Sequence, residues 1–415
     1  MIKFADKNYI LLAIYFILSL VFYPVIYLYN NKYYFPKEDY IKYLESPATI
    51  ALLSILIALF TIIIIQKVNW QKYLKLIIIV FLLISSILIS LPVVSSSDIF
   101  QYIFHAKIYN QYKQNPYTLY PYQFPDDILL DKVSDRQITA IYGPVWTLIS
   151  IGLNKISMND LELNVMLIKI LNFIFIILTA LLIFKIAKPN EKYLALFFFI
   201  LNPIIFYEFL LDGHNDIAMI FFIVLAIYLL KTKKYFWILP ASTLSILIKP
   251  LTIILLPIIF LYLIKRTNLS NVISSIILSI IIFILSWLPF YQGIETLKGF
   301  KKISSQASHP LLYLTNLFNL NLYYTKIAML IFFIIIYLVV IIYILNIKRH
   351  SFTNFLLFIS ILFLLIASFW LQPWYLTILI PLIAVKIPNN KLVYSLNIVY
   401  LLLIVYGFLA DNLII

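Results

Sequence analysis

Few side chains in this sequence could take part in acid–base chemistry, so their positions are informative. Among 415 residues there are 17 carboxylates, four histidines and no cysteine. One polar group opens with Asp98, which is followed at helical spacing by Tyr102, His105 and Tyr109. Positions i, i+4, i+7 and i+11 lie on one face of a helix. A carboxylate beside a phenol and an imidazole can accept a proton from a hydroxyl group, so Asp98 is a candidate general base.

The same pattern also has a purely structural interpretation. Three serines precede Asp98, and short polar residues are preferred at helix N-termini, so Asp98 could simply cap a helix over residues 98–112. His105 could lie along an apolar surface with its ring directed towards water. Because caps are far commoner than catalytic bases, the spacing alone favours the structural interpretation.

A second polar group lies between residues 202 and 216, where two apolar runs meet. Its members are Asn202, Glu208, Asp212, His214, Asn215 and Asp216. A polar hairpin turn with a sharp bend at Gly213 would explain Asp212 and Asn215, and Asn215 or Asp216 could cap the next helix. It does not explain Glu208 and Asp216, which extend into hydrophobic sequence, where a charge is costly unless it is paired or faces a cavity. We therefore favour a functional role for this group.

Three further features could bind a phosphate or a sugar. Lys249 stands alone before a proline and could meet a phosphate as a point charge, although a lysine at a helix end usually extends towards water. Gln372, Trp374 and Tyr375 belong by default to an interfacial aromatic belt, and a platform for a sugar ring is the second choice. His309 could contact a phosphate or a sugar hydroxyl, or have no role. The histidines lack metal-ligand spacing, so we expect no metal site.

The elements that must position these residues are membrane-spanning helices. Hydrophobic residues make up 64% of the chain and charged residues only 12%, whereas soluble domains average roughly 45–50% and 25%. Apolar runs long enough to cross the ~30 Å hydrocarbon core recur along the sequence. The net charge of +14 comes from lysines gathered in short segments between these runs, the pattern of cytoplasmic loops. The chain is therefore predicted to be an all-α polytopic membrane protein that does not bind nucleic acid.

Alternating lysine-rich segments with apolar runs predicts thirteen crossings, with the N-terminus in the cytoplasm and the C-terminus outside. The predicted spans are 9–29, 48–65, 76–94, 164–185, 193–211, 215–231, 236–248, 251–264, 271–290, 326–346, 352–371, 373–387 and 392–410. Residues 1–415 are expected to form one domain, with long extracytoplasmic loops at 95–163 and 291–325. Within the first loop we expect an amphipathic helix over 98–112 on the membrane surface and a short interfacial or re-entrant helix over 142–156.

The motifs, taken in order, resemble those of GT-C-type integral-membrane glycosyltransferases. The likeness is to the polyprenyl-phosphate-mannose-dependent α-mannosyltransferases of bacteria and archaea, and it extends from about residue 90 to 385. The matching pieces are Asp98, Asn115-Pro116-Tyr117, Tyr142-Gly143-Pro144-Val145-Trp146, Asn202-Pro203, Gly213-His214-Asn215-Asp216, Lys249-Pro250 and Gln372-Pro373-Trp374-Tyr375. Thirteen spans is also the number expected for this family. The Gly-His-Asn-Asp motif is the most specific piece, and the combination is stronger than any one motif.

The resemblance implies a lipid-phosphate sugar donor and chemistry on the outer face of the plasma membrane, with Asp98 as the catalytic base. A phosphate leaves as a stable anion, so one base suffices and no paired acid is needed. Lys249 would meet the charge that develops on the phosphate, with His214 and His309 as further candidates. The substrate-binding candidates are Tyr102, His105, Asn115, Tyr117, Tyr142, Glu208, His214, Asn215, Asp216, Lys249, His309, Gln372, Trp374 and Tyr375.

The expected activity is transfer of a sugar, most simply mannose, to a glycan or lipid-linked acceptor, with inversion and without a cofactor. A flippase or transporter of lipid-linked sugars is an alternative, but it would place buried charges at the bilayer midplane. A polymerase or ligase of surface polysaccharide would use the same outer site with an oligosaccharide-diphosphate donor. The positions of the candidate residues at the outer ends of the spans favour the transferase. The sequence does not identify the acceptor or the linkage.

Overall fold

Every regular element between residues 71 and 386 that can be described is a helix. The computed structural model describes residues 71–93, 96–202, 204–304, 318–346, 352–369 and 371–386, together with Ile14. No strand occurs in these ranges, which confirms the all-α class. A helix satisfies its backbone hydrogen bonds within one segment, as an apolar environment requires. The predicted spans 9–29, 48–65 and 392–410 lie outside the described residues, apart from Ile14.

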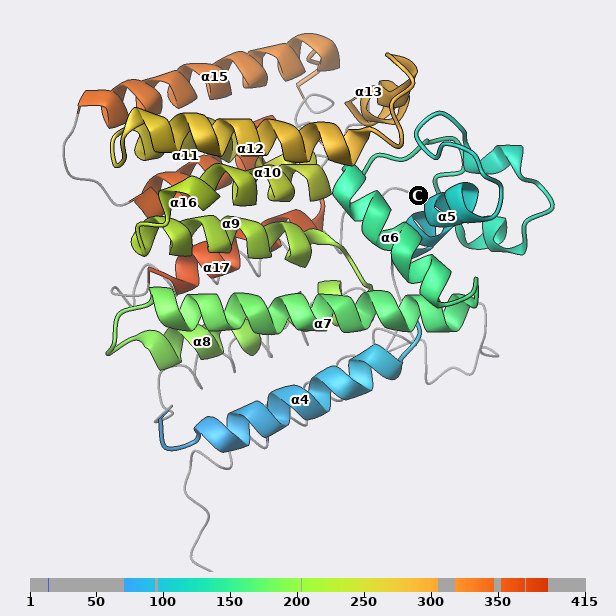
Figure 1. Cartoon of the computed structure of the whole chain (residues 1–415), viewed down its shortest axis with the longest axis horizontal. Helices are drawn as coiled ribbons and strands as arrows, with labels where there is room; N and C mark the ends of the chain where they lie inside the picture. The colour runs from blue at the N-terminus through green and yellow to red at the C-terminus, as the bar shows by residue number, and fades with distance from the viewer. Residues whose placement is uncertain are drawn as a thin grey trace, which may run out of the picture. The chain divides into compact units, whose positions relative to one another are not determined.

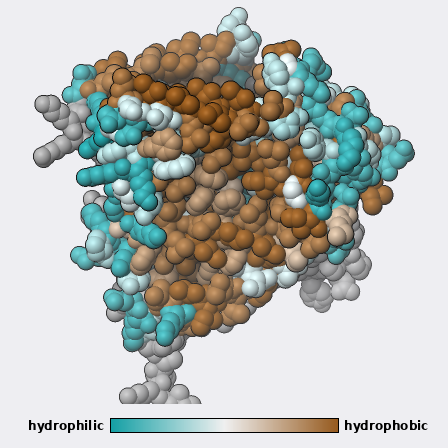
Figure 2. Space-filling model, in the orientation of Figure 1, coloured by the Kyte–Doolittle hydropathy of each residue, from teal (hydrophilic) through white to brown (hydrophobic). Residues whose placement is uncertain are grey.

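Three described helices are long and apolar enough to cross a bilayer. They are α7 (Leu161–Ile186), α12 (Leu269–Trp287) and α15 (Leu322–Asn346). On the face shown in Figure 2, hydrophobic side chains cover α12 and α15. Isoleucines of these two helices, such as Ile277 and Ile331, are exposed. So much exposed apolar surface suits contact with lipid rather than water. The chain is therefore a membrane protein, while the number of crossings stays a prediction.

One predicted continuous span is bent. The segment predicted as 193–211 consists of α8 (Lys192–Ile200) and η3 (Ile205–Leu211), whose axes differ by 52°. At the break, the side-chain oxygen of Asn202 accepts a hydrogen bond from the backbone N–H of Ile204 over 3.2 Å. A short polar side chain that bonds to its own backbone competes with the helical pattern, which accounts for a bend here.

Shorter apolar helices correspond to the other predicted spans in the described ranges. They are α4 (Leu74–Ser90), α9 (Asp216–Lys231), α10 (Ile238–Ile248), α11 (Leu256–Ile264), α16 (Phe352–Leu362) and α17 (Leu379–Ala384). The predicted break at Lys249–Pro250 is confirmed, because α10 ends at Ile248 and Lys249 is extended with φ −146° and ψ 121°. A residue before proline is disfavoured in the helical region. The chain resumes in η5 (Pro250–Leu255), which runs into α11.

The chain divides into two compact units. Unit 1 comprises residues 1–96, 169–214 and 383–415, and unit 2 comprises 97–168 and 215–382. In unit 1, α4 contacts η3, and the rings of Phe81 and Phe206 lie 5.8 Å apart. In unit 2, α9 packs against α10 and α10 packs against α12 (Figure 1). Asp98 and Lys249 belong to unit 2, whereas Glu208 and His214 belong to unit 1.

The helix that carries Asp98 differs from its prediction. α5 (Asp98–Asn110) has the predicted start, but side chains on both of its faces are buried, so it lacks the solvent-exposed face of the predicted amphipathic helix. The reason is that α6 (Pro144–Ile156) packs along α5 and η2 (Ile128–Lys132) also contacts it. Other parts of the same loop therefore cover α5.

The amphipathic helix of this region is α6. Its polar residues Thr147, Ser150 and Asn154 are buried, while Leu148 and Ile156 are exposed. Asn110 of α5 donates hydrogen bonds to Asn154 Oδ1 over 2.8 Å and to the carbonyl oxygen of Ile151 over 2.9 Å. Polar contacts therefore hold α5 and α6 together, and this pair fixes the position of Asp98.

Candidate active site

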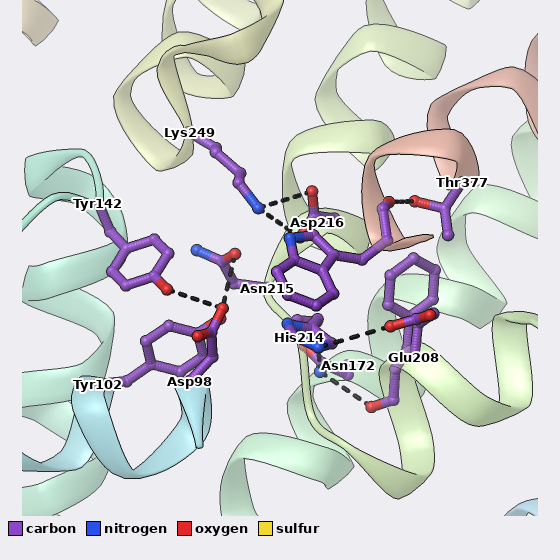
Figure 3. Close-up of polar contacts among 12 residues, drawn as sticks. Asp98, Tyr102, Tyr142, Asn172, Glu208, His214, Asn215, Asp216, Lys249 and Thr377 are labelled. Atoms are coloured by element: carbon purple, nitrogen blue, oxygen red, sulfur yellow. Dashed lines mark hydrogen bonds and ion pairs between the residues drawn. The ribbon is translucent and has the colours of Figure 1, made fainter. Parts of the chain in front are cut away.

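Asp98 is the first residue of α5, and a tyrosine just before α6 holds its carboxylate. Tyr142 Oη donates a hydrogen bond to Asp98 Oδ2 over 2.9 Å (Figure 3). The N-cap of α5 is Ser97, which makes no side-chain hydrogen bond to the helix backbone. Asp98 therefore does not occupy the capping position that its structural interpretation required, although a carboxylate in the first turn still suits the positive end of a helix.

Tyr102, Tyr142 and Trp146 form an aromatic cluster, and Tyr142 connects it to Asp98. The ring of Tyr102 lies edge-on to Tyr142, with centroids 4.6 Å apart, and to Trp146, with centroids 5.4 Å apart. Burial, followed by the negative charge of Asp98, raises the pKa of both tyrosines well above the usual 10.0. Both phenols therefore stay protonated at neutral pH, and Tyr142 remains a hydrogen-bond donor to the carboxylate.

A buried ion pair forms the other charged part of the site. Lys249 Nζ lies 2.9 Å from Asp216 Oδ1 and 2.8 Å from Asp216 Oδ2. The Asp216 side chain is fully shielded and that of Lys249 is 9% exposed. Because removing two charges from water is expensive, such a pair persists only with good geometry, which the double contact provides.

Aromatic rings complete the surroundings of the lysine. Lys249 Nζ lies 4.6 Å from the ring centroid of Tyr375 and 5.9 Å from that of Trp374, both from η8 (Pro373–Ile378). These are distances at which a cation is attracted to an aromatic face. The ammonium group thus points into the protein, which excludes the interpretation of Lys249 as a lysine extended towards water.

Asn215 occupies the N-cap position of α9 but does not cap the helix with its side chain. Its Oδ1 instead accepts a hydrogen bond from Tyr102 Oη over 3.4 Å, and its amide lies between the Tyr142–Asp98 and Lys249–Asp216 pairs (Figure 3). Its Nδ2 is buried and has no hydrogen-bond partner among the described residues. Asn215 therefore does not provide the side-chain cap that the structural alternative allowed, and its side chain is directed to the site.

One cavity joins the carboxylate and the cation. It has a volume of about 340 Å³, and both Asp98 and Lys249 line it. Its wall also includes Tyr142, Trp374 and Tyr375. Residues from four separated parts of the sequence thus meet around one space, with a candidate base and a candidate phosphate-binding cation both facing it.

Glu208 and His214 form a separate buried contact within unit 1. His214 Nε2 lies 3.5 Å from Glu208 Oε2, and the backbone N–H of His214 donates to the carbonyl oxygen of Glu208 over 2.8 Å. Gly213 has a φ of +77°, a conformation that side chains other than that of glycine rarely adopt. This turn ends directly before Asn215, the N-cap residue of α9.

Asn172, which was not among the residues predicted from the sequence, also holds this turn. Its Nδ2 donates to the carbonyl oxygens of Phe209 over 3.0 Å and of His214 over 2.9 Å. The available signal was an amide in the middle of α7, because a polar residue in an apolar helix is costly without a partner. Lys169 gives a similar signal, and it donates to the carbonyl oxygen of Leu91 over 2.7 Å.

The Asn115-Pro116-Tyr117 segment supports the site from behind. Asn115 Nδ2 donates to the carbonyl oxygen of Phe290 over 2.7 Å, and Asn115 Oδ1 accepts from the backbone N–H of Tyr117 over 3.0 Å. Tyr117 Oη in turn donates to the carbonyl oxygen of Tyr142 over 2.7 Å. These contacts fix the backbone that carries Tyr142, and neither Asn115 nor Tyr117 lines the cavity.

The remaining candidates have different surroundings. His105 is buried on α5 and does not line the cavity; burial lowers its pKa from 6.5 to about 4, so its ring is neutral. Gln372 is the extended residue before η8, which presents Trp374 and Tyr375 to the cavity. His309 lies outside the described residues. Within the described ranges, no cluster of three or more His, Asp or Glu side chains could hold a metal ion.

Comparison with known proteins gives one match. Residues 42–265 match the model of a family described as alpha-(1->6)-mannopyranosyltransferase, N-terminal domain. The match covers slightly more than half of the chain and contains both Asp98 and Lys249, whereas Trp374 and Tyr375 lie beyond it. Neither curated proteins nor solved structures gave a match.

Proposed function

Because the chain belongs to the alpha-(1->6)-mannopyranosyltransferase family, we propose that it transfers mannose from a polyprenyl-phosphate donor to a hydroxyl group of an acceptor. The protein is a membrane-bound glycosyltransferase of the GT-C type. The acceptor in this proposal is a glycan or a lipid-linked sugar, and the reaction takes place on the extracytoplasmic side. The observation that carries the proposal is the cavity shared by Asp98 and Lys249.

Asp98 acts in this proposal as the general base. As the acceptor hydroxyl oxygen attacks the anomeric carbon, Asp98 takes its proton, and the bond between that carbon and the phosphate oxygen breaks. The electron pair leaves with the phosphate, so the products are the mannosylated acceptor and polyprenyl phosphate. One displacement inverts the anomeric centre. An α-linkage, as in the family description, then requires a β-configured donor.

Lys249 stabilises the leaving group. The donor phosphodiester carries one negative charge, and the departing phosphomonoester gains a second as the bond breaks. A fixed cation therefore interacts more strongly with the transition state than with the bound donor, which accelerates the reaction itself. Asp216 keeps the ammonium in place before the donor arrives, because its two oxygens hold Nζ at 2.8 and 2.9 Å.

A second cavity supports a donor with a long apolar chain. It has a volume of about 550 Å³ and lies between α10, the η5–α11 segment and α12. Its lining is almost entirely apolar and includes Leu247 and Ile253, which flank Lys249 in the sequence. An isoprenoid chain in this cavity would place its phosphate near the lysine at the end of α10. Burial of each methylene would contribute roughly 0.8 kcal/mol.

The distribution of lysines supports the extracytoplasmic location. α9 runs from Asp216 to Lys231, and α10 ends at Ile248, directly before Lys249. Lys231 ends α9, and Lys233 and Lys234 follow it before α10, so these three lysines lie at the ends of the two helices remote from the Asp216–Lys249 pair. Because lysines in short loops favour the cytoplasmic side, the opposite ends of α9 and α10 face outwards.

The proposal is tested with purified protein and radiolabelled donors. Transfer of label from polyprenyl-phosphate mannose, with little or no transfer from polyprenyl-phosphate glucose, is the expected result, and nuclear magnetic resonance of the product should show an α-linked mannose. The matched control is the Asp98→Asn variant, which should bind the donor and transfer slowly. Transfer from glucose alone would overturn the choice of sugar. Transport of an intact lipid-linked sugar without hydrolysis or transfer would overturn the enzyme class.

A further inference from the structure

We propose that Tyr142 is a positioning residue that fixes the direction of the Asp98 carboxylate for proton transfer. The proposal rests on the proposed function, in which Asp98 is the general base. The proposal extends the proposed function, because it gives Tyr142 a role that acts through Asp98 rather than through contact with the sugar.

The first observation is the hydrogen bond between the two side chains. Tyr142 Oη donates to Asp98 Oδ2 over 2.9 Å, and both residues line the same cavity. A bond to one carboxylate oxygen restricts rotation of the group about its own axis. The direction of the other oxygen is then set as well. A misplacement of about 1 Å at a reacting group can cost roughly 10²-fold in rate, so such a restraint has a measurable effect.

The second observation is that Tyr142 is itself held at both its ring and its backbone. Its ring lies edge-on to Tyr102 with centroids 4.6 Å apart, and its carbonyl oxygen accepts a hydrogen bond from Tyr117 Oη over 2.7 Å. A phenol that is fixed at both ends can orient a carboxylate, whereas a mobile one could not. The contacts of Asn115 and Tyr117 therefore contribute to the site indirectly, because they fix Tyr142, which in turn orients Asp98.

The third observation connects Tyr142 to the part of the chain that carries the lysine. The backbone N–H of Gly143 donates to the carbonyl oxygen of Ile248 over 2.9 Å. A Cβ atom at Gly143 would lie 2.1 Å from the carbonyl oxygen of Leu247, a distance that no side chain can occupy. Only glycine permits this approach, which places Tyr142 next to the residue that precedes Lys249. This one backbone hydrogen bond therefore fixes the position of Tyr142, the partner of the base, relative to Lys249.

The test removes only the hydroxyl group. Tyr142→Phe should lower kcat about 10- to 10²-fold, in keeping with a lost restraint on a base. The donor KM should stay within about twofold, because the lost group acts on the acceptor side of the reaction. The matched control is Tyr112→Phe, which removes a hydroxyl that donates to the carboxylate of Asp127 over 2.7 Å in the outer loop. That variant loses the same type of bond outside the cavity and should keep the wild-type kcat.

The double variant separates positioning from direct action on the substrate. In the Asp98→Asn background, Tyr142→Phe should cause little further loss, because a residue that acts through Asp98 has nothing left to position. Independent, multiplying losses, or a raised donor KM, would show that Tyr142 contacts the substrate and would overturn the proposal. An unchanged kcat in the single variant would overturn it too. Thermal unfolding of each variant identifies a folding defect. KM does not depend on how much of the protein is folded, so for a poorly folded Tyr142→Phe protein the donor KM relative to that of the wild type decides whether Tyr142 contacts the donor.

The two proposals fail in different ways. If the wild-type protein does not use polyprenyl-phosphate mannose, the proposed function fails at the choice of donor. The role of Tyr142 is then measured with whichever lipid-phosphate sugar is used. If the wild-type protein transfers mannose, and Tyr142→Phe lowers kcat by the same factor with and without Asp98→Asn, only the positioning role of Tyr142 fails.

Discussion

Lys249 Nζ contacts both carboxylate oxygens of Asp216, at 2.9 and 2.8 Å, and the two side chains are almost completely shielded from solvent. Removal of one partner from such a pair leaves an uncompensated buried charge, which typically costs about 3–5 kcal/mol. The functional role of the lysine must therefore be separated from its contribution to stability.

Lys249→Met should raise the apparent donor KM and lower kcat, because the cation that meets the phosphate is lost. It should also lower the free energy of unfolding by about 3–5 kcal/mol, since the buried carboxylate of Asp216 loses the cation that contacts both of its oxygens. The paired variant Lys249→Met with Asp216→Asn removes both charges and should recover most of the stability without recovering donor binding. Recovery of donor kinetics together with stability would show that Lys249 has a structural role only.

Asp98→Asn should lower turnover by about 10²–10⁴-fold, the usual contribution of a positioned base. The amide oxygen can still accept the hydrogen bond from Tyr142, so the unfolding temperature should change little. Donor affinity should be retained, because the base acts on the acceptor hydroxyl. Near-native turnover would contradict the assignment and would move the search for the base to Glu208 or Asp216.

The cap interpretation of Asp98 makes a different prediction. A capping residue replaced by alanine costs about 1 kcal/mol of stability. Because Ser97 occupies the N-cap position, we expect Asp98→Ala to be inactive with a smaller loss of stability than a lost cap would cause. Thermal unfolding of the alanine and asparagine variants side by side measures this difference.

The topology can be tested with single cysteines, because the chain has none of its own. A cysteine at Ser96, at the start of the predicted outer loop that carries Asp98, should react with an impermeant reagent in intact cells. A cysteine at Thr232, in the lysine-rich turn after α9, should react only after the membrane is permeabilised. The predicted outer positions Ser308 and Asn412 extend the test. Labelling at Thr232 in intact cells would contradict the proposed orientation.

His105 should make stability depend on pH in a specific range. Burial lowers its pKa from 6.5 to about 4 in the folded protein. The unfolded chain therefore binds a proton below pH ~6.5 that the folded protein excludes until about pH 4. The stabilisation is complete above pH ~6.5 and is lost progressively as the pH falls towards 4. His105→Gln should flatten this part of a plot of unfolding temperature against pH, and an unchanged slope would contradict the assignment.

Local features of the sequence were sufficient to predict the long apolar helices among the described residues and several of their boundaries, but not short helices such as α13 (Lys298–Ser304). Apolar runs identify helices because a backbone in an apolar environment must satisfy its own hydrogen bonds. The break after Ile248 followed from Pro250, which lacks a backbone N–H and disfavours a helical residue before it. The start of α5 at Asp98 followed from a change from serines to an apolar periodic pattern. The motifs that place the chain in its family were likewise visible as short, ordered sets of residues.

Only the tertiary structure decided which of these residues meet. Tyr142 reaches Asp98 across 44 residues of sequence, and Lys249 reaches Asp216 across 33. Spacing along one helix predicts its faces but not what covers them, so α5 was expected on a surface and is instead buried under α6 and η2. The same limit explains why the partners of Asn172 could not be predicted, although an amide within an apolar helix indicates that it needs partners. Contacts between distant segments depend on the path of loops and on packing, and a local pattern contains neither.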